Sequence, residues 1–192
     1  MQQDDWAYFK EAFTRSVEAI RQEYFMVARQ GAGAVARERV YCYELYHQLR
    51  CRLPESLEYV LHGEIDKAGH ARVLDAVRAT ARRSGTPEGS ALGRAGGFNP
   101  DFVVHRPGYA FNLAVIEVKS AIAVARRPAD ARRDIAKLEA FCRATGVAYS
   151  HGILLIFGEP MPTVARLDLP SSPSTVEVLW HGSVGQPPHP LS

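Results

Sequence analysis

Two acidic residues and a lysine lie at the edges of two apolar runs near the middle of the chain. Asp101 directly precedes the run 102–104, and Glu117 and Lys119 follow the run 113–116. Carboxylates beside an ammonium group can hold a divalent cation and orient a water molecule for attack. The residue types therefore indicate hydrolytic chemistry, provided that folding brings the three side chains together.

The two apolar runs are expected to form an antiparallel hairpin, because Arg106-Pro107-Gly108-Tyr109 is a turn signal. A hairpin centred near Tyr109 gives the facing pairs Val104 with Ala114, Val103 with Val115, Phe102 with Ile116 and Asp101 with Glu117. Facing Cβ atoms lie about 4.5–5.5 Å apart, and Glu117 and Lys119 share one face of their strand. A bulge in the turn would shift this register by one residue and separate the acids.

Two facing carboxylates repel each other, so that one must be protonated or a cation must lie between them. A divalent cation between the Asp101 and Glu117 carboxylates would remove the repulsion and give them a function as ligands. An all-oxygen site favours Mg²⁺ or Mn²⁺ over zinc. The peptide carbonyl of Val118 would add another oxygen ligand. Lys119 would then orient the metal-bound water or stabilise negative charge developing on a phosphate.

The remaining pattern predicts an α/β domain with a mixed sheet flanked by helices, in the order α-β-β-β-α-β. We expect helices over 35–52, 71–83 and 128–145, a strand over 57–65, the two hairpin strands, further strands over 152–157 and 175–180, and a loop over 84–99. The domain itself spans 31–182. An amphipathic helix over 1–30 precedes it, and a disordered tail over 183–192 follows it.

The helix over 1–30 carries a broad apolar stripe at three- and four-residue steps, from Trp6 to Val27. Packing on the main domain is the favoured interpretation of this stripe. The alternative is that it packs on a second subunit and forms a homodimer.

Pro100-Asp101, fifteen intervening residues and Glu117-Val118-Lys119 resemble the motif of the PD-(D/E)XK nuclease superfamily, and the match extends over roughly 35–157. The resemblance implies a restriction-endonuclease-like core and Mg²⁺-dependent hydrolysis of phosphodiester bonds, in DNA and less often in RNA. In that scheme Asp101 and Glu117 hold the metal, with the Val118 carbonyl, and Lys119 acts on the attacking water.

The resemblance also implies an acid on the first core helix. Glu38 shares the inward face of Tyr41, Leu45 and Leu49 and is the favoured candidate, as a metal ligand directly or through water. Glu44 is the alternative, although the helical spacing turns it away from that face. Glu64, at the end of the first predicted strand, is a further candidate, or simply a solvated strand end.

Basic residues gather on the helix after the site, among them Arg132, Arg133 and Lys137. They would contact the phosphates of a nucleic acid. The alternative is a solvated helix face with i, i+4 ion pairs. The run from Asp134 through Lys137 to Leu138 also resembles a D-x-x-K-L helix of related nucleases.

Composition limits the other classes of function. The net charge is only +2 over 192 residues, so that nucleic-acid binding has to rest on local patches. Three cysteines and no apolar membrane-length stretch indicate a reduced, cytoplasmic protein without membrane segments. A non-catalytic binding module with the same fold stays open as an alternative, as does a surface Glu117–Lys119 pair without function.

Overall fold

A mixed six-stranded sheet forms the centre of the protein in the computed structural model, which describes residues 2–54, 57–63, 71–83, 85, 99–107, 112–144, 148–163, 167 and 175–191. The strands follow each other in chain order across the sheet. The first three are antiparallel, the third to the fifth are parallel, and the last is antiparallel again. Their bounds are β3 (Val60–Gly63), β4 (Phe102–His105), β5 (Asn112–Ser120), β6 (Tyr149–Phe157), β7 (Val176–His181) and β8 (His189–Pro190).

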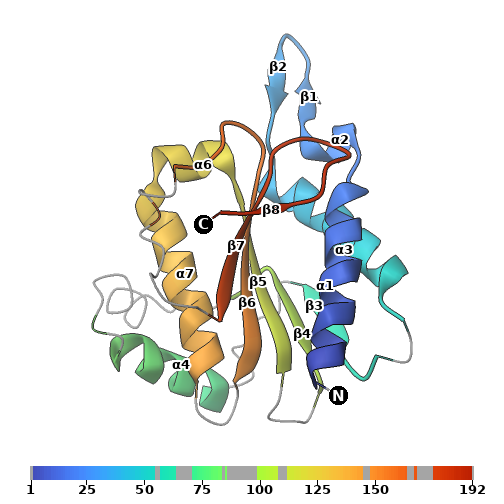
Figure 1. Ribbon diagram of the computed structural model, residues 1–192. Helices are drawn as coiled ribbons and strands as arrows, with labels where there is room; N and C mark the ends of the chain where they lie inside the picture. The colour runs from blue at the N-terminus through green and yellow to red at the C-terminus, as the bar shows by residue number, and fades with distance from the viewer. Residues whose placement is uncertain are drawn as a thin grey trace.

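Helices cover both faces of the sheet, which gives three layers (Figure 1). One face carries α1 (Gln2–Glu18), α2 (Gln22–Phe25) and α3 (Glu38–Arg52), and the other carries α4 (Ala71–Arg83), α6 (Ala121–Arg126) and α7 (Pro128–Arg143). Each face has its own apolar core. The predicted α/β class and the mixed, helix-flanked sheet are therefore confirmed.

The central strands β5 and β6 read as nearly continuous apolar runs because both of their faces are covered. The helix α7 packs closely on β6: a Cβ added at Gly152 would lie 3.2 Å from the Cβ of Leu138. The absence of a side chain at Gly152 thus lets α7 approach the sheet. Pro128 starts this helix at a position where no backbone N–H is needed.

The predicted hairpin register is confirmed at three pairs, since Phe102 pairs with Ile116, Val103 with Val115 and Val104 with Ala114. An irregularity does occur, but it lies between Val104 and His105, on the turn side of these pairs. The end of the hairpin that carries Asp101, Glu117 and Lys119 therefore keeps the expected alignment.

The N-terminal segment differs from a single helix over 1–30. The helix α1 ends at Glu18, and after α2 the chain forms a small hairpin of β1 (Val27–Arg29) and β2 (Ala32–Val35), with Gly31 at a φ of 71° in its turn. Only glycine adopts such a φ readily, which explains why the chain turns here. In Figure 1 this hairpin projects from the body beside the start of α3.

The apolar stripe of the N-terminal segment packs on the sheet of its own chain. Phe9, Phe13 and Val17 of α1 are fully buried in the same core as Tyr41 and Leu45 of α3. The favoured interpretation, core packing, is confirmed, and these side chains are not available to form a dimer surface.

The C-terminal segment differs from the disordered tail expected over 183–192. The strand β8 pairs with β7, and the Leu191 N–H donates to the Val178 carbonyl at 2.9 Å. The physical reason is the open edge of β7, whose unpaired backbone groups this segment satisfies. Most of the predicted loop over 84–99 lies outside the described residues. None of the described helices has the length and apolarity needed to cross a membrane.

Candidate active site

Asp101 is held at the start of β4 by a backbone hydrogen bond across the hairpin. The Val118 N–H donates to Asp101 Oδ2 at 2.7 Å. Burial raises the pKa of the Asp101 carboxyl, while the Val118 N–H, Lys119 and Lys137 oppose this rise. The hydrogen bond therefore fixes the carboxylate beside the Glu117-Val118-Lys119 segment, as the predicted register requires.

Glu117 and Lys119 both point from β5 toward α7, on the face of the sheet that Val103 and Val115 share. Glu117 is only 2% exposed. Its burial raises the pKa of its carboxyl, Lys137 lowers it, and Asp101 and Asp134 raise it further. A solvated surface pair of Glu117 and Lys119 is thus not what the structure contains.

Two residues of α7, Asp134 and Lys137, complete a buried cluster of charges. Lys137 Nζ lies 2.5 Å from Glu117 Oε1 and 3.4 Å from Asp134 Oδ1. Lys119 Nζ lies 3.3 Å from Asp134 Oδ2. Asp134 therefore bridges the two ammonium groups, and the ion pairs connect β5 to α7.

Two carboxylate oxygens of this cluster accept no hydrogen bond within the described part of the chain. Glu117 Oε1 and Asp134 Oδ2 are buried, and neither has a hydrogen-bond partner there. Each oxygen nevertheless lies at ion-pair distance from an ammonium group, Glu117 Oε1 from Lys137 and Asp134 Oδ2 from Lys119, and the contact with Lys137 lowers the pKa of Glu117. These ion pairs offset part of the cost of burying the carboxylate oxygens, and a bound cation would offset it further.

Glu38 reaches the site from the first turn of α3. Its Oε1 accepts hydrogen bonds from the Ser120 N–H at 2.9 Å and from the Ser120 hydroxyl at 3.2 Å. Ser120 Oγ in turn caps α6 by accepting from the Ala123 N–H at 3.3 Å. The favoured helix acid thus lies at the end of β5, next to Lys119.

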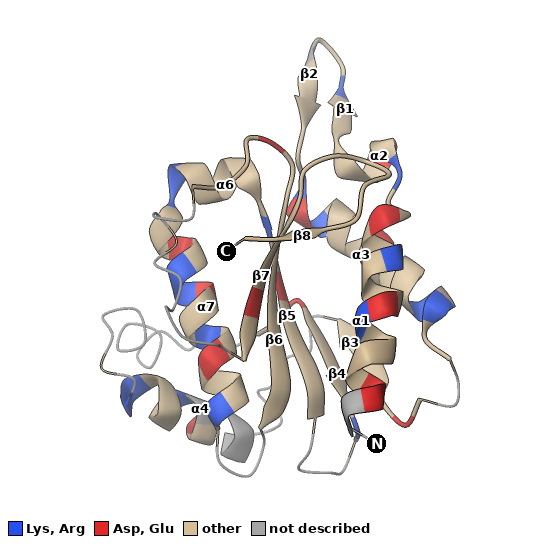
Figure 2. Cartoon of the chain, viewed as in Figure 1, with Lys and Arg blue, Asp and Glu red and all other residues tan. Residues whose placement is uncertain are grey.

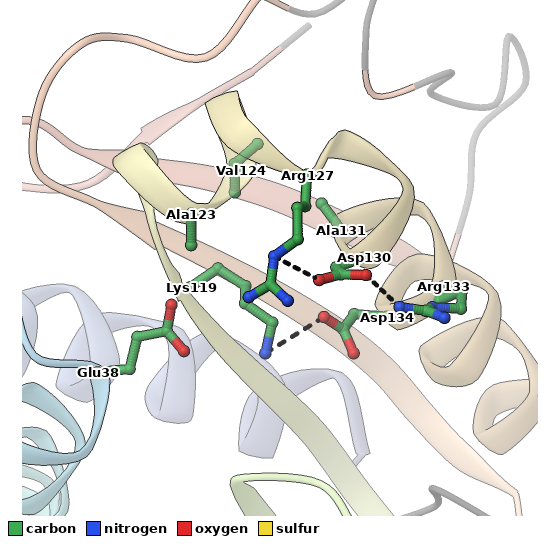
Figure 3. A pocket seen from close by; sticks show the side chains of 9 residues that line it. All are labelled: Glu38, Lys119, Ala123, Val124, Arg127, Asp130, Ala131, Arg133 and Asp134. Atoms are coloured by element: carbon green, nitrogen blue, oxygen red, sulfur yellow. Dashed lines mark hydrogen bonds and ion pairs between the residues drawn. The ribbon is translucent and has the colours of Figure 1, made fainter. Parts of the chain in front are cut away.

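A pocket of about 250 Å³ opens over this end of β5. Figure 3 shows Glu38 on one side of it, Lys119 in the middle and Asp134 on the other side, with Arg127 and Asp130 above. Glu117 and Lys137 lie further inside, reached from the pocket through the contacts of Asp134. The pocket gives solvent and small groups access to the Lys119 ammonium.

Lys119 is held in its charged form. Burial lowers the pKa of its ammonium, but Asp134, Glu117, Asp101 and Glu38 outweigh this effect and raise it. An ammonium of this kind donates hydrogen bonds and attracts anions, and it does not accept a proton from water near neutral pH.

The alternative acids take other places. Glu44 is buried rather than turned out to solvent, and it accepts a hydrogen bond from Gln48 at 2.7 Å and lies near Arg21. It is not part of the charge cluster. Glu64 lies outside the described residues.

The basic residues of α7 divide into two groups. Lys137 was expected to contact phosphates, but it is buried, because an inward position on α7 places it against Glu117. Arg133 pairs with Asp130, and Arg127 Nε lies 3.2 Å from the same carboxylate, as Figure 3 shows. Arg132 is partly exposed. Lys137 thus belongs to the site and not to an outer surface.

Asp134 is the site residue that the spacing argument missed, although the D-x-x-K-L pattern contained the signal. Ile135, Leu138 and Phe141 of α7 are buried, and residues three apart on a helix share a face. Asp134 and Lys137 flank these apolar positions and so reach the edge of the same core.

The donor set fits a hard divalent cation. Asp101 and Glu117 supply carboxylate oxygens at the same end of adjacent strands, and oxygen ligands of this kind suit Mg²⁺ or Mn²⁺. Within the described ranges, however, no three His, Cys, Asp or Glu side chains are gathered in a metal-binding arrangement. In this structure Lys137 provides the positive charge beside Glu117.

Comparisons with known proteins assign the chain to no family. No protein-family model matches the chain, and no curated protein and no solved structure shows significant similarity to it. The class of protein that the fold and site define is therefore an α/β domain with a buried carboxylate–lysine cluster at one end of its central sheet.

Proposed function

We propose that this protein is a metal-dependent nuclease with a restriction-endonuclease-like core, which hydrolyses phosphodiester bonds in DNA. One observation carries the proposal: the hairpin register brings Asp101, Glu117 and Lys119 to the same end of β4 and β5. This is the arrangement expected from the resemblance to the PD-(D/E)XK superfamily. The element order from α3 to β6 supports the same core.

Asp101 and Glu117 would hold Mg²⁺ or Mn²⁺, with the Val118 carbonyl as a further ligand and Glu38 as a ligand directly or through water. The bound ion would polarise a phosphoryl oxygen and lower the pKa of a water molecule. Glu38 already accepts two hydrogen bonds through Oε1, which orient the carboxylate at the pocket.

Lys119 has the role of a fixed positive charge in this proposal. Its ammonium borders the pocket and stays protonated beside Asp134. It would stabilise the negative charge that accumulates on the phosphate during attack, and it would orient the attacking water by donating a hydrogen bond to it. Because the ammonium has no free electron pair, the proton released by the attacking water would pass to bulk water, which reaches Lys119 through the pocket.

Exposed arginines next to the pocket and on the projecting hairpin would bind the nucleic-acid backbone. Arg29 of β1, Arg37 before α3 and Arg126 of α6 are exposed, and their side chains make no ion pair or hydrogen bond within the described part of the protein. In Figure 2 basic positions on β1, at the start of α3 and on α6 lie in the half of the molecule from which the small hairpin projects. Such unpaired guanidinium groups suit phosphate contacts.

The alternative is a module that retains the fold and binds nucleic acid or protein without cleaving. The ion pair between Lys137 and Glu117 favours this alternative, since it balances the charge of Glu117 without a metal. Metal-dependent cleavage distinguishes the two functions.

The test compares cleavage of plasmid, single-stranded and branched DNA, with and without Mg²⁺ or Mn²⁺, by the wild type and by Lys119→Met. We expect cleavage only with metal, and a loss of about 100-fold or more in Lys119→Met. Arg143→Met is the matched control, because Arg143 pairs with Glu139 at the far end of α7. Equal cleavage by Lys119→Met and wild type would refute the role of Lys119, and no cleavage under any condition would favour the binding module.

A further inference from the structure

A second lysine, Lys137, occupies the interior of the site. Its side chain is 7% exposed, and its Nζ lies 2.5 Å from Glu117 Oε1. The same ammonium lies 3.4 Å from Asp134 Oδ1 and donates a hydrogen bond to the Asn99 carbonyl at 3.4 Å. Lys137 therefore connects α7, β5 and the segment that precedes Asp101.

A buried carboxylate such as Glu117 needs a positive partner, because an uncompensated charge in the interior is strongly destabilising. Lys119 is not the ion-pair partner of Glu117, because its ammonium pairs with Asp134 Oδ2. Lys137 is the ammonium in contact with Glu117, and it is therefore the internal counter-ion of that carboxylate.

A divalent ion would cancel the excess negative charge of the site. Asp101, Glu117, Asp134 and Glu38 supply four carboxylates, whereas Lys119 and Lys137 supply two ammonium groups. With all of them ionised the cluster is negative and repels a phosphate. With one divalent cation added the excess negative charge is cancelled, so that the cluster no longer repels a phosphate.

Lys137 and a metal ion would compete for the same oxygen. Two cations cannot both lie against Glu117 Oε1 without strong repulsion in a buried site. The ammonium has somewhere to go, because Asp134 Oδ1 and the Asn99 carbonyl are already within 3.4 Å.

We propose that Lys137 holds Glu117 in the metal-free protein and is displaced toward Asp134 when a divalent cation binds. This inference rests on the proposed metal site at Asp101 and Glu117. It makes Lys137 a positioning residue that keeps the site folded without metal and weakens metal binding in return.

The test titrates Mn²⁺ into the full chain without DNA and follows the free ion by electron paramagnetic resonance. The proteins are wild type, Lys137→Met, Lys137→Gln and Arg143→Met, compared at alkaline pH so that the carboxylates are ionised. We expect both Lys137 variants to bind Mn²⁺ at least about tenfold more tightly than the wild type, because a positive charge next to the ion is removed. Arg143→Met removes a charge from the same helix, outside the cluster, and should bind as the wild type does.

Thermal unfolding gives a second readout. Without metal the Lys137 variants should unfold at a lower temperature than the wild type, and saturating Mn²⁺ should raise their midpoint by more than it raises that of the wild type. The glutamine variant retains a hydrogen-bond donor toward Glu117, so that it remains informative if the methionine variant does not fold.

The outcomes separate this inference from the proposed function. Mn²⁺ binding in the wild type with equal or weaker binding in the Lys137 variants would overturn the inference and leave the metal site intact. An absence of Mn²⁺ binding in all four proteins would overturn the metal site and the inference together.

Discussion

The Val118 N–H donates a hydrogen bond to Asp101 Oδ2 at 2.7 Å, across the end of the β4–β5 hairpin. This contact uses the backbone of the residue between Glu117 and Lys119 to orient the carboxylate of the neighbouring strand. The spacing of the motif therefore lets the backbone of β5 orient the Asp101 carboxylate at the start of β4.

Replacement of Asp101 by alanine should destabilise the metal-free protein. The change leaves the Val118 N–H without its acceptor in a largely buried place, which costs about 1–3 kcal/mol in the free energy of unfolding. Urea unfolding of the wild type, Asp101→Ala and Asp101→Asn measures the difference. Asp101→Asn retains a side-chain oxygen that can accept the bond, so it should lose less stability than Asp101→Ala while abolishing Mn²⁺ binding. A loss of stability that is equal in the two variants would contradict the importance of this hydrogen bond.

The pH dependence of stability should reveal the buried carboxyl of Glu117. Because burial raises its pKa in the folded protein, the native state binds more protons than the unfolded chain above about pH 4.5, the ordinary value for glutamate. The metal-free protein should therefore lose stability as the pH rises from about 5 toward 9, and Glu117→Gln should lose less.

The matched measurement is a series of urea unfolding curves for the wild type and Glu117→Gln over that range, with Mg²⁺ and without. The difference between the two proteins isolates Glu117 from other titrating groups, such as His181, whose pKa burial lowers to about 4. Because metal binding requires the ionised carboxylates, Mg²⁺ should stabilise the wild type more at high pH than at low pH. Parallel curves for the two proteins would contradict a raised pKa at Glu117.

The exposed arginines around the pocket should control the salt dependence of DNA binding. Replacing Arg37 and Arg126 together by glutamine removes two expected phosphate contacts, so that the slope of log K against log salt should fall by about two. Fluorescence anisotropy in Ca²⁺, between about 50 and 200 mM salt, measures this slope. Arg143→Gln is the control at a distance from the pocket. An equal slope in the wild type, the double variant and Arg143→Gln would show that the DNA lies elsewhere on the protein. An absence of binding in all of them would contradict the proposed DNA contact altogether.

The sequence sufficed for those parts of the fold that depend on local pattern. The register of β4 and β5 followed from two apolar runs and one turn signal, and the inward face of α3 followed from the spacing of Tyr41, Leu45 and Leu49. The break after Glu18 was not predicted, because the apolar residues continue at helical spacing into a segment that the structure folds as a hairpin around Gly31.

The candidate site was predictable only in its β-strand half. The positions of Asp101, Glu117 and Lys119 relative to one another are set within one hairpin, where sequence separation and geometry correspond directly. The contact between Lys137 and Glu117 depends on how α7 packs on β5 and β6. This packing is a tertiary relationship, and it is close because Gly152 has no side chain. Periodicity placed Lys137 on a helix but could not place that helix against Glu117.

The most direct test of the central claim is a crystal of the protein soaked in Mn²⁺ and measured at a wavelength where manganese scatters anomalously. We expect an anomalous peak within coordination distance of carboxylate oxygens of both Asp101 and Glu117, with the Lys137 ammonium withdrawn from Glu117. A soaked crystal without a peak at these carboxylates, in which Lys137 keeps its contact with Glu117, would contradict it.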